Sequence, residues 1–234
     1  MTRLSLGLVA AGCVWGLTQG LASAAPITVL NHSFESGPLY VGSPAAVTDW
    51  GLSSTTAVIG VTTVVTPTQW NTATTPDGTN RYLFSNTSNS FARQTIQNHT
   101  IQSGTYTLSV DLGLRKALTQ NLTGVSLQMW SLNGGTFENM AATTIPTANI
   151  PVGTWQSFST SVEVTGTSQH LGRPLMIQFQ VLNGQQLAMD NVRLDFTAAV
   201  PEPGMLGLLS VGGLACAAQW HRKRWRPARI ATQA

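Results

Sequence analysis

Polar and apolar residues alternate with a period of about two over much of residues 25–200, and this stretch has no helical periodicity. Alternation of this kind predicts half-buried β-strands, because successive side chains of a strand point to opposite faces. Turn-forming pairs such as Ser103-Gly104 separate the alternating runs. The expected strands lie at residues 56–65, 82–85, 91–96, 106–112, 125–131, 155–164, 175–182 and 188–196. The pattern predicts an all-β fold, a two-sheet antiparallel β-sandwich. Asn183-Gly184 is expected to close a hairpin between the last two strands.

The two ends of the chain carry long apolar runs in place of alternation. Residues 1–24 start with Arg3, continue through an apolar stretch and finish in Ala22-Ser23-Ala24, which is typical of a cleaved signal peptide. Residues 204–220 carry no formal charge and are long enough for a short transmembrane helix. By the positive-inside rule, the basic residues that follow would stay in the cytoplasm: Arg222, Lys223, Arg224 and Arg226. The alternative is a buried core helix with a basic end.

The order of features in residues 200–234 resembles the PEP-CTERM sorting signal of Gram-negative bacteria that make exopolysaccharide. The segment opens with the sorting motif Val200, Pro201, Glu202 and Pro203, and the apolar run and the basic cluster follow. The resemblance implies an exosortase as a partner, a transient anchor in the inner membrane, and delivery to the cell surface or extracellular matrix. The expected organisation is a signal peptide (1–24), a β-sandwich ectodomain (25–199) and a sorting segment (200–234).

The positive net charge of the chain comes from its two ends and not from its middle region. The whole chain has a net charge of +3 and a sequence pI near 9.2. Residues 25–200 hold six basic and eight acidic side chains, so the positive charge belongs to the ends. This distribution gives no reason to expect nucleic-acid binding. Both cysteines, Cys13 and Cys216, also lie in the terminal segments, which leaves the middle region without disulfide or thiol chemistry.

Three short motifs in the middle region resemble the galactose-binding-like jelly rolls found in many bacterial carbohydrate-binding modules. They are Asn31-His32-Ser33-Phe34-Glu35, Gly104-Thr105-Tyr106-Thr107-Leu108 and Asp190-Asn191-Val192-Arg193-Leu194, in that order. The resemblance implies a jelly roll whose first and last strands are adjacent, with a structural calcium ion bound near them.

The same resemblance places Glu35 close to Asp190. Calcium prefers hard oxygen ligands, so these two carboxylates with nearby backbone carbonyls are the predicted metal ligands. Asn191 departs from the pattern, because a second Asp is common at that position. The alternative is that Glu35 is solvated or pairs with Arg193, while Asp190 caps a turn.

Trp70 and Tyr82 are the predicted glycan-binding side chains, because sugar C–H faces stack on aromatic rings. Trp70 lies in a polar, loop-like stretch, and the alternative is a loop aromatic folded over the edge of the sandwich. Trp50, Trp130 and Trp155 have strand-like surroundings and are expected in the core.

The sequence gives little support for catalysis. It has no Gly-x-Ser-x-Gly elbow and no metal-ligand spacing among its histidines, and no catalytic residue is predicted. Glu138 and Glu163 are conceivable as the acid pair of a glycosidase, but both are expected to be ordinary solvated carboxylates. The sequence therefore predicts a non-enzymatic, exported surface or matrix protein associated with extracellular polysaccharide. A secreted polysaccharide hydrolase and a purely structural surface protein are the alternatives.

Overall fold

The computed structural model describes residues 23–37, 47–52, 58–63, 75–84, 90–114, 116, 124–182 and 187–199, with backbone alone at 58–63 and 82–84. Within these ranges the chain forms strands and a short 3-10 helix, Thr147–Asn149. The strands are β1 (Ala25–Ile27), β2 (Gly51–Leu52), β3 (Val58–Thr63), β4 (Asn80–Phe84), β5 (Ser90–Thr100), β6 (Gly104–Leu114), β7 (Gly124–Asn133), β8 (Thr136–Pro146), β9 (Gln156–Val164), β10 (Pro174–Val181) and β11 (Leu187–Ala198).

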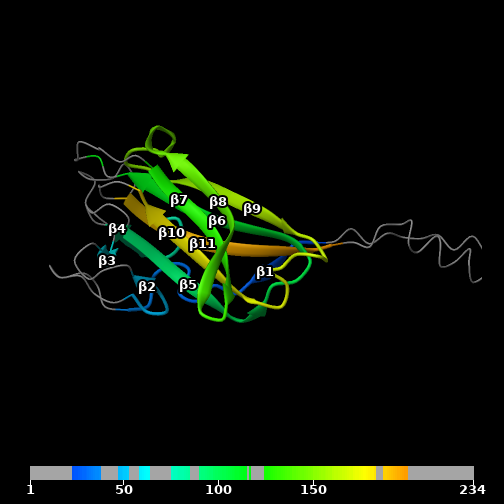
Figure 1. The fold of residues 1–234 in the computed structure, drawn as a ribbon. Coiled ribbons are helices and arrows are strands. Elements are labelled where there is room, and N and C mark those ends of the chain that lie inside the picture. The colour runs from blue at the N-terminus through cyan, green and yellow to red at the C-terminus, as the bar shows by residue number, and fades with distance from the viewer. Residues whose placement is uncertain are drawn as a thin grey trace, which may run out of the picture.

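These strands make two antiparallel sheets that face each other (Figure 1). In the first, sheet A, the order is β3-β4-β11-β6-β9, and β1 also pairs with β11. In the second, sheet B, the order is β2-β5-β10-β7-β8. The predicted all-β, two-sheet antiparallel sandwich is confirmed, and so is the adjacency of the first and last strands.

The predicted hairpin between the last two strands is wrong. β10 pairs with β5 and β7 in sheet B, whereas β11 pairs with β1, β4 and β6 in sheet A. The last connection therefore crosses from one sheet to the other. A pair of turn residues between two alternating runs indicates a change of direction but does not say that the two strands share a sheet.

The core lies between the sheets and is made from alternate residues of the central strands. β6 contributes Tyr106, Leu108, Val110, Leu112 and Leu114, and β10 contributes Leu175, Ile177, Phe179 and Val181. The ring centroids of Phe34 and Phe179 lie 5.4 and 6.0 Å from that of Trp50. Each of these side chains contributes about 1.5–3 kcal/mol when it leaves water. The prediction of a core Trp50 is confirmed.

Strands β1, β2 and β8 do not appear among the predicted elements. β1 and β2 have only three and two residues, too few to show a period. β8 is longer, but it is an edge strand in which only Ile145 is fully buried. An edge strand with so little buried surface has no apolar alternation to detect.

Several predictions fall outside the described residues. They concern most of the signal peptide, the motif at 200–203, the helix at 204–220 and the basic cluster at 222–226. Among the described residues, no helix is long and apolar enough to cross a membrane. The terminal assignments therefore stay predictions.

Candidate active site

A turn at residues 75–80 covers a pair of acidic residues on the outer face of sheet A. Asp111 of β6 and Asp190 of β11 are partners in the strand register, and their chain neighbours Leu112 and Met189 point into the core. An outward side chain is ordinarily wet, yet Asp111 and Asp190 are only 6% and 0% exposed. The turn accounts for this, since its Asp77 N–H donates to Asp190 Oδ2 at 3.0 Å.

Burial has a clear electrostatic effect on Asp190. Loss of hydration raises the pKa of its carboxyl group to about 7, and the charges of Asp77 and Asp111 act in the same direction. Hydrogen bonds from the backbone N–H groups of Asp77 and Asn191 oppose the shift but do not cancel it. Two carboxyl groups therefore face each other here, and one of them binds a proton near neutral pH.

The opening motif at residues 31–35 holds Glu35 against the same turn. The Asn31 side chain donates to the carbonyls of Ser36 and Thr48 at 2.9 and 3.0 Å and accepts from the Ser36 N–H at 3.0 Å. Phe34 is fully buried at a left-handed φ of 56°, so the chain reverses sharply around it. This reversal places Glu35 outside the core.

Glu35 accepts three hydrogen bonds from the turn. Its Oε1 accepts from the Thr79 and Asn80 N–H groups at 2.6 Å each, and its Oε2 accepts from Thr79 Oγ1 at 3.0 Å. His32 Nδ1 lies 3.3 Å from Asp77 Oδ2, but both side chains are well exposed, so this contact contributes little. The turn is thus fixed from one side by Glu35 and from the other by Asp190.

A β-bulge in β11 determines how Asp111 is held. The register with β6 shifts between Asp190 and Arg193, and Asn191 takes a left-handed φ of 52°. Asn191 Nδ2 then donates to Asp111 Oδ2 at 2.7 Å, while Ser157 Oγ of β9 donates to Asp111 Oδ1. Arg193 Nη2 lies 3.8 Å from the same Oδ1. Both oxygens of Asp111 therefore have a partner that fixes the carboxylate plane.

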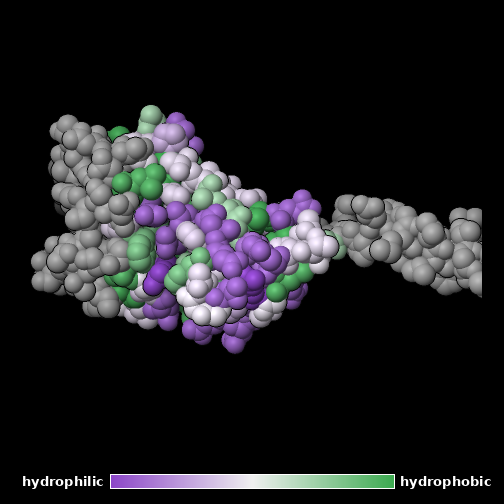
Figure 2. Space-filling view, in the orientation of Figure 1, coloured by the Kyte–Doolittle hydropathy of each residue, from purple (hydrophilic) through white to green (hydrophobic). Residues whose placement is uncertain are grey.

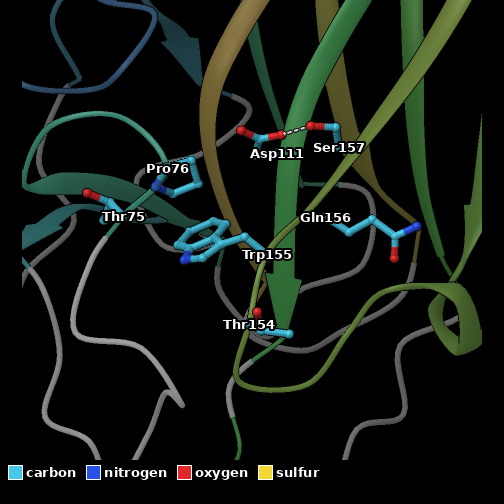
Figure 3. Close-up of a pocket in the computed structure, with 7 residues that line it drawn as sticks. All are labelled: Thr75, Pro76, Asp111, Thr154, Trp155, Gln156 and Ser157. Atoms are coloured by element: carbon cyan, nitrogen blue, oxygen red, sulfur yellow. Dashed lines mark hydrogen bonds between the residues drawn. The ribbon is translucent and has the colours of Figure 1, made fainter.

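Beside Asp111 the surface forms a cavity of about 300 Å³, which we call the site cavity. It is lined by Thr75, Pro76, Asp111, Thr154, Trp155, Gln156 and Ser157. Figure 3 shows the Trp155 ring directed toward Thr75 and Pro76, with the Asp111–Ser157 hydrogen bond above it and Gln156 turned away. A volume of this size is at the lower end of the range for small-molecule pockets.

The structure brings the two predicted calcium ligands to one turn. Glu35 bonds Thr79 and Asn80, and Asp190 bonds Asp77, whereas Arg193 is directed to Asp111 and not to Glu35. Asn80 Oδ1 is buried and accepts no hydrogen bond from any described group. No group of three or more His, Cys, Asp or Glu side chains that could hold a metal occurs in the described ranges. The oxygen donors present are nonetheless of the kind that calcium prefers.

The aromatic predictions have mixed outcomes. Trp70 lies outside the described residues, and Tyr82 is described only by its backbone in β4, so neither prediction is tested. Trp155 was expected in the core, but it is half-buried and lines the site cavity. Trp130 was also expected in the core, but it lies on the outer face of sheet B and donates to Gln128 Oε1 at 3.1 Å. Alternation alone does not show which face of a strand is the buried one.

Residues 25–195 match the model of the HpiC1-like family, whose description is HpiC1 cyclase. The chain belongs to this family. The chain is similar to a solved Stig cyclase, Fisc from Fischerella sp. TAU in complex with (3Z)-3-(1-methyl-2-pyrrolidinylidene)-3H-indole. The similarity covers 76% of this chain and 100% of the Fisc chain, with 20% identity and a TM-score of 0.63. An apo cyclase from Fischerella sp. shows 22% identity and a TM-score of 0.63 over 77% of this chain and 100% of its own. No curated protein matches the chain.

A third similar structure is the Fischerella sp. TAU cyclase in complex with 4-(1H-indol-3-yl)butan-2-one. Its identity is 20% and its TM-score 0.61, over 75% of this chain and 100% of its own. At these identities the solved structures show the fold, and the jelly-roll resemblance is confirmed at that level.

The family assignment corrects the functional prediction. A non-enzymatic surface protein associated with exopolysaccharide was expected, together with a hydrolase or a ligand-free structural protein as alternatives. The HpiC1-like family points to a cyclase, so these expectations, including the absence of an enzyme, are wrong. The match brings no support for a PEP-CTERM sorting segment or for the transmembrane and exopolysaccharide assignments.

Proposed function

We propose that the protein is a cyclase that binds an indole-bearing substrate in the site cavity and closes a ring on it. Membership of a cyclase family supports the reaction, and the indole compounds in two of the similar cyclase structures support the substrate class. The observation that carries the proposal is that Trp155 and Asp111 line one cavity. An aromatic ring offers a stacking surface for indole, and a carboxylate stabilises the positive charge that develops during ring closure.

Closure of an indole onto an unsaturated side chain needs one proton to be delivered and one to be removed. Protonation of the alkene makes an electrophilic carbon, the indole ring forms the new C–C bond to it, and loss of a ring proton restores the aromatic system. The net reaction is an isomerisation, so no oxidant or second substrate is required. Asp111 is suited to exchange both protons, because Asn191 and Ser157 keep its carboxyl group oriented beside the cavity.

Calcium would act as a structural ion in this proposal. In this chain Glu35, Asp190 and the buried Asn80 Oδ1 are the side-chain oxygens that would hold the ion, with backbone carbonyls completing its shell. The bound ion would offset the repulsion between carboxylates and tie the 75–80 turn, one wall of the site cavity, to sheet A.

We also propose that the domain works after export, on the basis of the N-terminal sequence alone. The apolar stretch before Ala22-Ser23-Ala24 predicts cleavage near Ala24, and β1 starts directly afterwards at Ala25. Mass spectrometry of protein recovered from the periplasm or medium of an expressing bacterium tests this. A mature N-terminus at or near Ala25 is expected, and an intact Met1 on all of the protein would contradict it.

The cyclase proposal is tested by incubating the full chain with 3-substituted indoles whose side chain carries an alkene. The expected result is a product of unchanged mass and new chromatographic retention. Trp155→Ala is expected to weaken substrate binding and Asp111→Asn to slow turnover. Ser159→Ala, on β9 but outside the cavity lining, should behave as the parent protein. Equal turnover by Asp111→Asn and the parent would refute the proposed role of Asp111.

A further inference from the structure

Arg93 of β5 lies on the outer face of sheet B, away from the site cavity. Its register partner on β10 is Gln178, and the partner of Gln178 on β7 is Gln128, so the three polar side chains follow one another across the sheet. Figure 2 shows mostly hydrophilic residues over the region where Figure 1 places β5, β10 and β7. The outer face of sheet B therefore carries a row of polar side chains that is separate from the site cavity.

Two aromatic rings hold the Arg93 guanidinium in place. Its Cζ lies 5.0 Å from the centroid of Phe91, two residues earlier on β5, and 5.0 Å from that of Phe137 on β8. Cation–π contacts of this kind favour the charged group and restrict its rotamers. Phe137 is 38% exposed, so it also presents apolar surface to a ligand.

Arg93 differs from Arg173 and Arg193 in the groups that its guanidinium faces. Arg173 Nη1 donates to Glu138 Oε2 at 2.6 Å, and Arg193 lies next to Asp111. Within the described residues, by contrast, no carboxylate lies within ion-pair distance of Arg93 and no group accepts a hydrogen bond from it. A guanidinium has five N–H donors in a fixed planar arrangement, and those of Arg93 remain available.

A network of amides fixes the neighbouring Gln178. Gln128 Oε1 accepts from Gln178 Nε2 at 2.8 Å and from Trp130 Nε1 at 3.1 Å, while Gln128 Nε2 donates to Ser126 Oγ and Gln180 Oε1. The amide of Gln178 therefore has a defined orientation. Its Nε2 donates to Gln128, and among the described residues no group donates to its Oε1, which lies on the strand next to Arg93.

We propose that Arg93, with Phe91, Phe137 and Gln178, forms a binding site for a small organic 2-hydroxycarboxylate. The guanidinium fork matches the two oxygens of a carboxylate, and Gln178 Oε1 is suited to accept from a hydroxyl group on the adjacent carbon. The rings contact an apolar substituent. Because Arg93 is already held by these rings, binding has less side-chain entropy to lose. This site is independent of the cyclase proposal.

Calorimetric titration of the full chain with mandelate, phenylacetate and inorganic phosphate tests the site. Mandelate is expected to bind more tightly than phenylacetate, which lacks the hydroxyl group, and phosphate least. Arg93→Met should weaken mandelate binding by at least about tenfold. Arg93→Lys should also weaken it, because an ammonium group lacks the planar fork. Lys116→Met, which removes one exposed positive charge elsewhere, should leave it unchanged.

Phe137→Ala provides a second variant at an exposed position, where loss of the fold is not expected. It should reduce affinity for mandelate more than for phosphate, because only the organic ligand contacts the ring. Unchanged mandelate binding by Arg93→Met, or no binding of either carboxylate at millimolar concentration, would overturn the proposal. Tighter binding of phosphate than of mandelate would overturn the carboxylate class.

Discussion

The two outer faces of the sandwich bury polar groups in different ways. On sheet A, Asp111 and Asp190 are covered by a turn from elsewhere in the chain and are held by groups from that turn, from β9 and from a bulge. On sheet B, Gln128 and Gln178 are nearly buried but bond to one another within the sheet. Burial of a carboxyl group costs far more than burial of a satisfied amide. The buried carboxyl pair on sheet A borders the site cavity, and the proposed catalytic role of Asp111 explains why a carboxyl group is buried there.

The largest expected loss of stability distinguishes a Gly→Ala substitution in the 75–80 turn on sheet A from one in the β7–β8 hairpin of sheet B. Gly78 has a φ of 69°, and a Cβ added there would overlap the Glu35 carboxylate. Gly134 has a φ of 56°, but a Cβ added there would have no atom within 4 Å. Gly78→Ala should lower the free energy of unfolding by about 3 kcal/mol, because strain and overlap add. Gly134→Ala should lower it by only about 1 kcal/mol, from backbone strain alone. Equal losses in urea unfolding would show that Glu35 does not pack against the turn.

Asp111→Asn is expected to affect activity much more than stability. The amide keeps the size of the side chain and still accepts from Asn191 or Ser157, so the free energy of unfolding should change by less than about 1 kcal/mol. The rate of ring closure should fall by about 10²-fold, as is typical when a charged group at a developing cation is lost. Steady-state kinetics with matched urea unfolding checks both halves. A variant that loses stability and activity together would give Asp111 a structural role only.

Disrupting the amide network on sheet B should lower the free energy of unfolding and leave the rate of ring closure unchanged. Gln128→Leu leaves Gln178 and Trp130 without their shared acceptor and should lower the free energy of unfolding by about 2 kcal/mol. Gln97→Leu, at an exposed position on β5, is the control, with an expected change within about 0.5 kcal/mol. Loss of cyclase activity in folded Gln128→Leu protein would contradict the division of roles between the two faces.

The smallest effect concerns Glu138 on β8. Hydrogen bonds from Asn133 and Arg173 lower the pKa of this carboxyl group from its ordinary value of 4.5. The folded state then releases the proton more readily than the unfolded state, so the stabilisation is present above about pH 4.5 and is lost as pH falls below it. Thermal melts of the parent and Glu138→Gln should therefore differ most near neutral pH and converge in acid. A difference that grows on acidification would have the wrong sign.

Much of the fold follows from alternation, because the central strands bury one face completely. β6, β7 and β10 lie close to their predicted positions, since Leu108, Leu127 and Ile177 recur with their neighbours at a period of two. The pairing of strands does not follow from the same signal, which is why the assignment of β10 and β11 to one hairpin was wrong. The edge strand β8 escaped notice because its residues face water on most sides.

The site was partly within reach of the sequence. The opening and closing motifs predicted that Glu35 and Asp190 lie in one region, and in the structure each accepts a hydrogen bond from the 75–80 turn. Asp111 and Trp155 were missed as a pair, because only the tertiary fold places a residue of β6 beside one that precedes β9. The Tyr106–Leu112 segment contained a signal, because its one acidic residue, Asp111, occupies an outward position of a strictly alternating strand.

Binding of an indole compound in the cavity beside Asp111 and Trp155 is the step on which the proposed function depends. The most direct measurement is an NMR titration of isotope-labelled full chain with 4-(1H-indol-3-yl)butan-2-one. We expect concentration-dependent shifts of the Trp155 indole N–H and the Ser157 amide, and loss of the Ser157 shift in Trp155→Ala. Binding that shifts neither group, or that persists unchanged in Trp155→Ala, would contradict it.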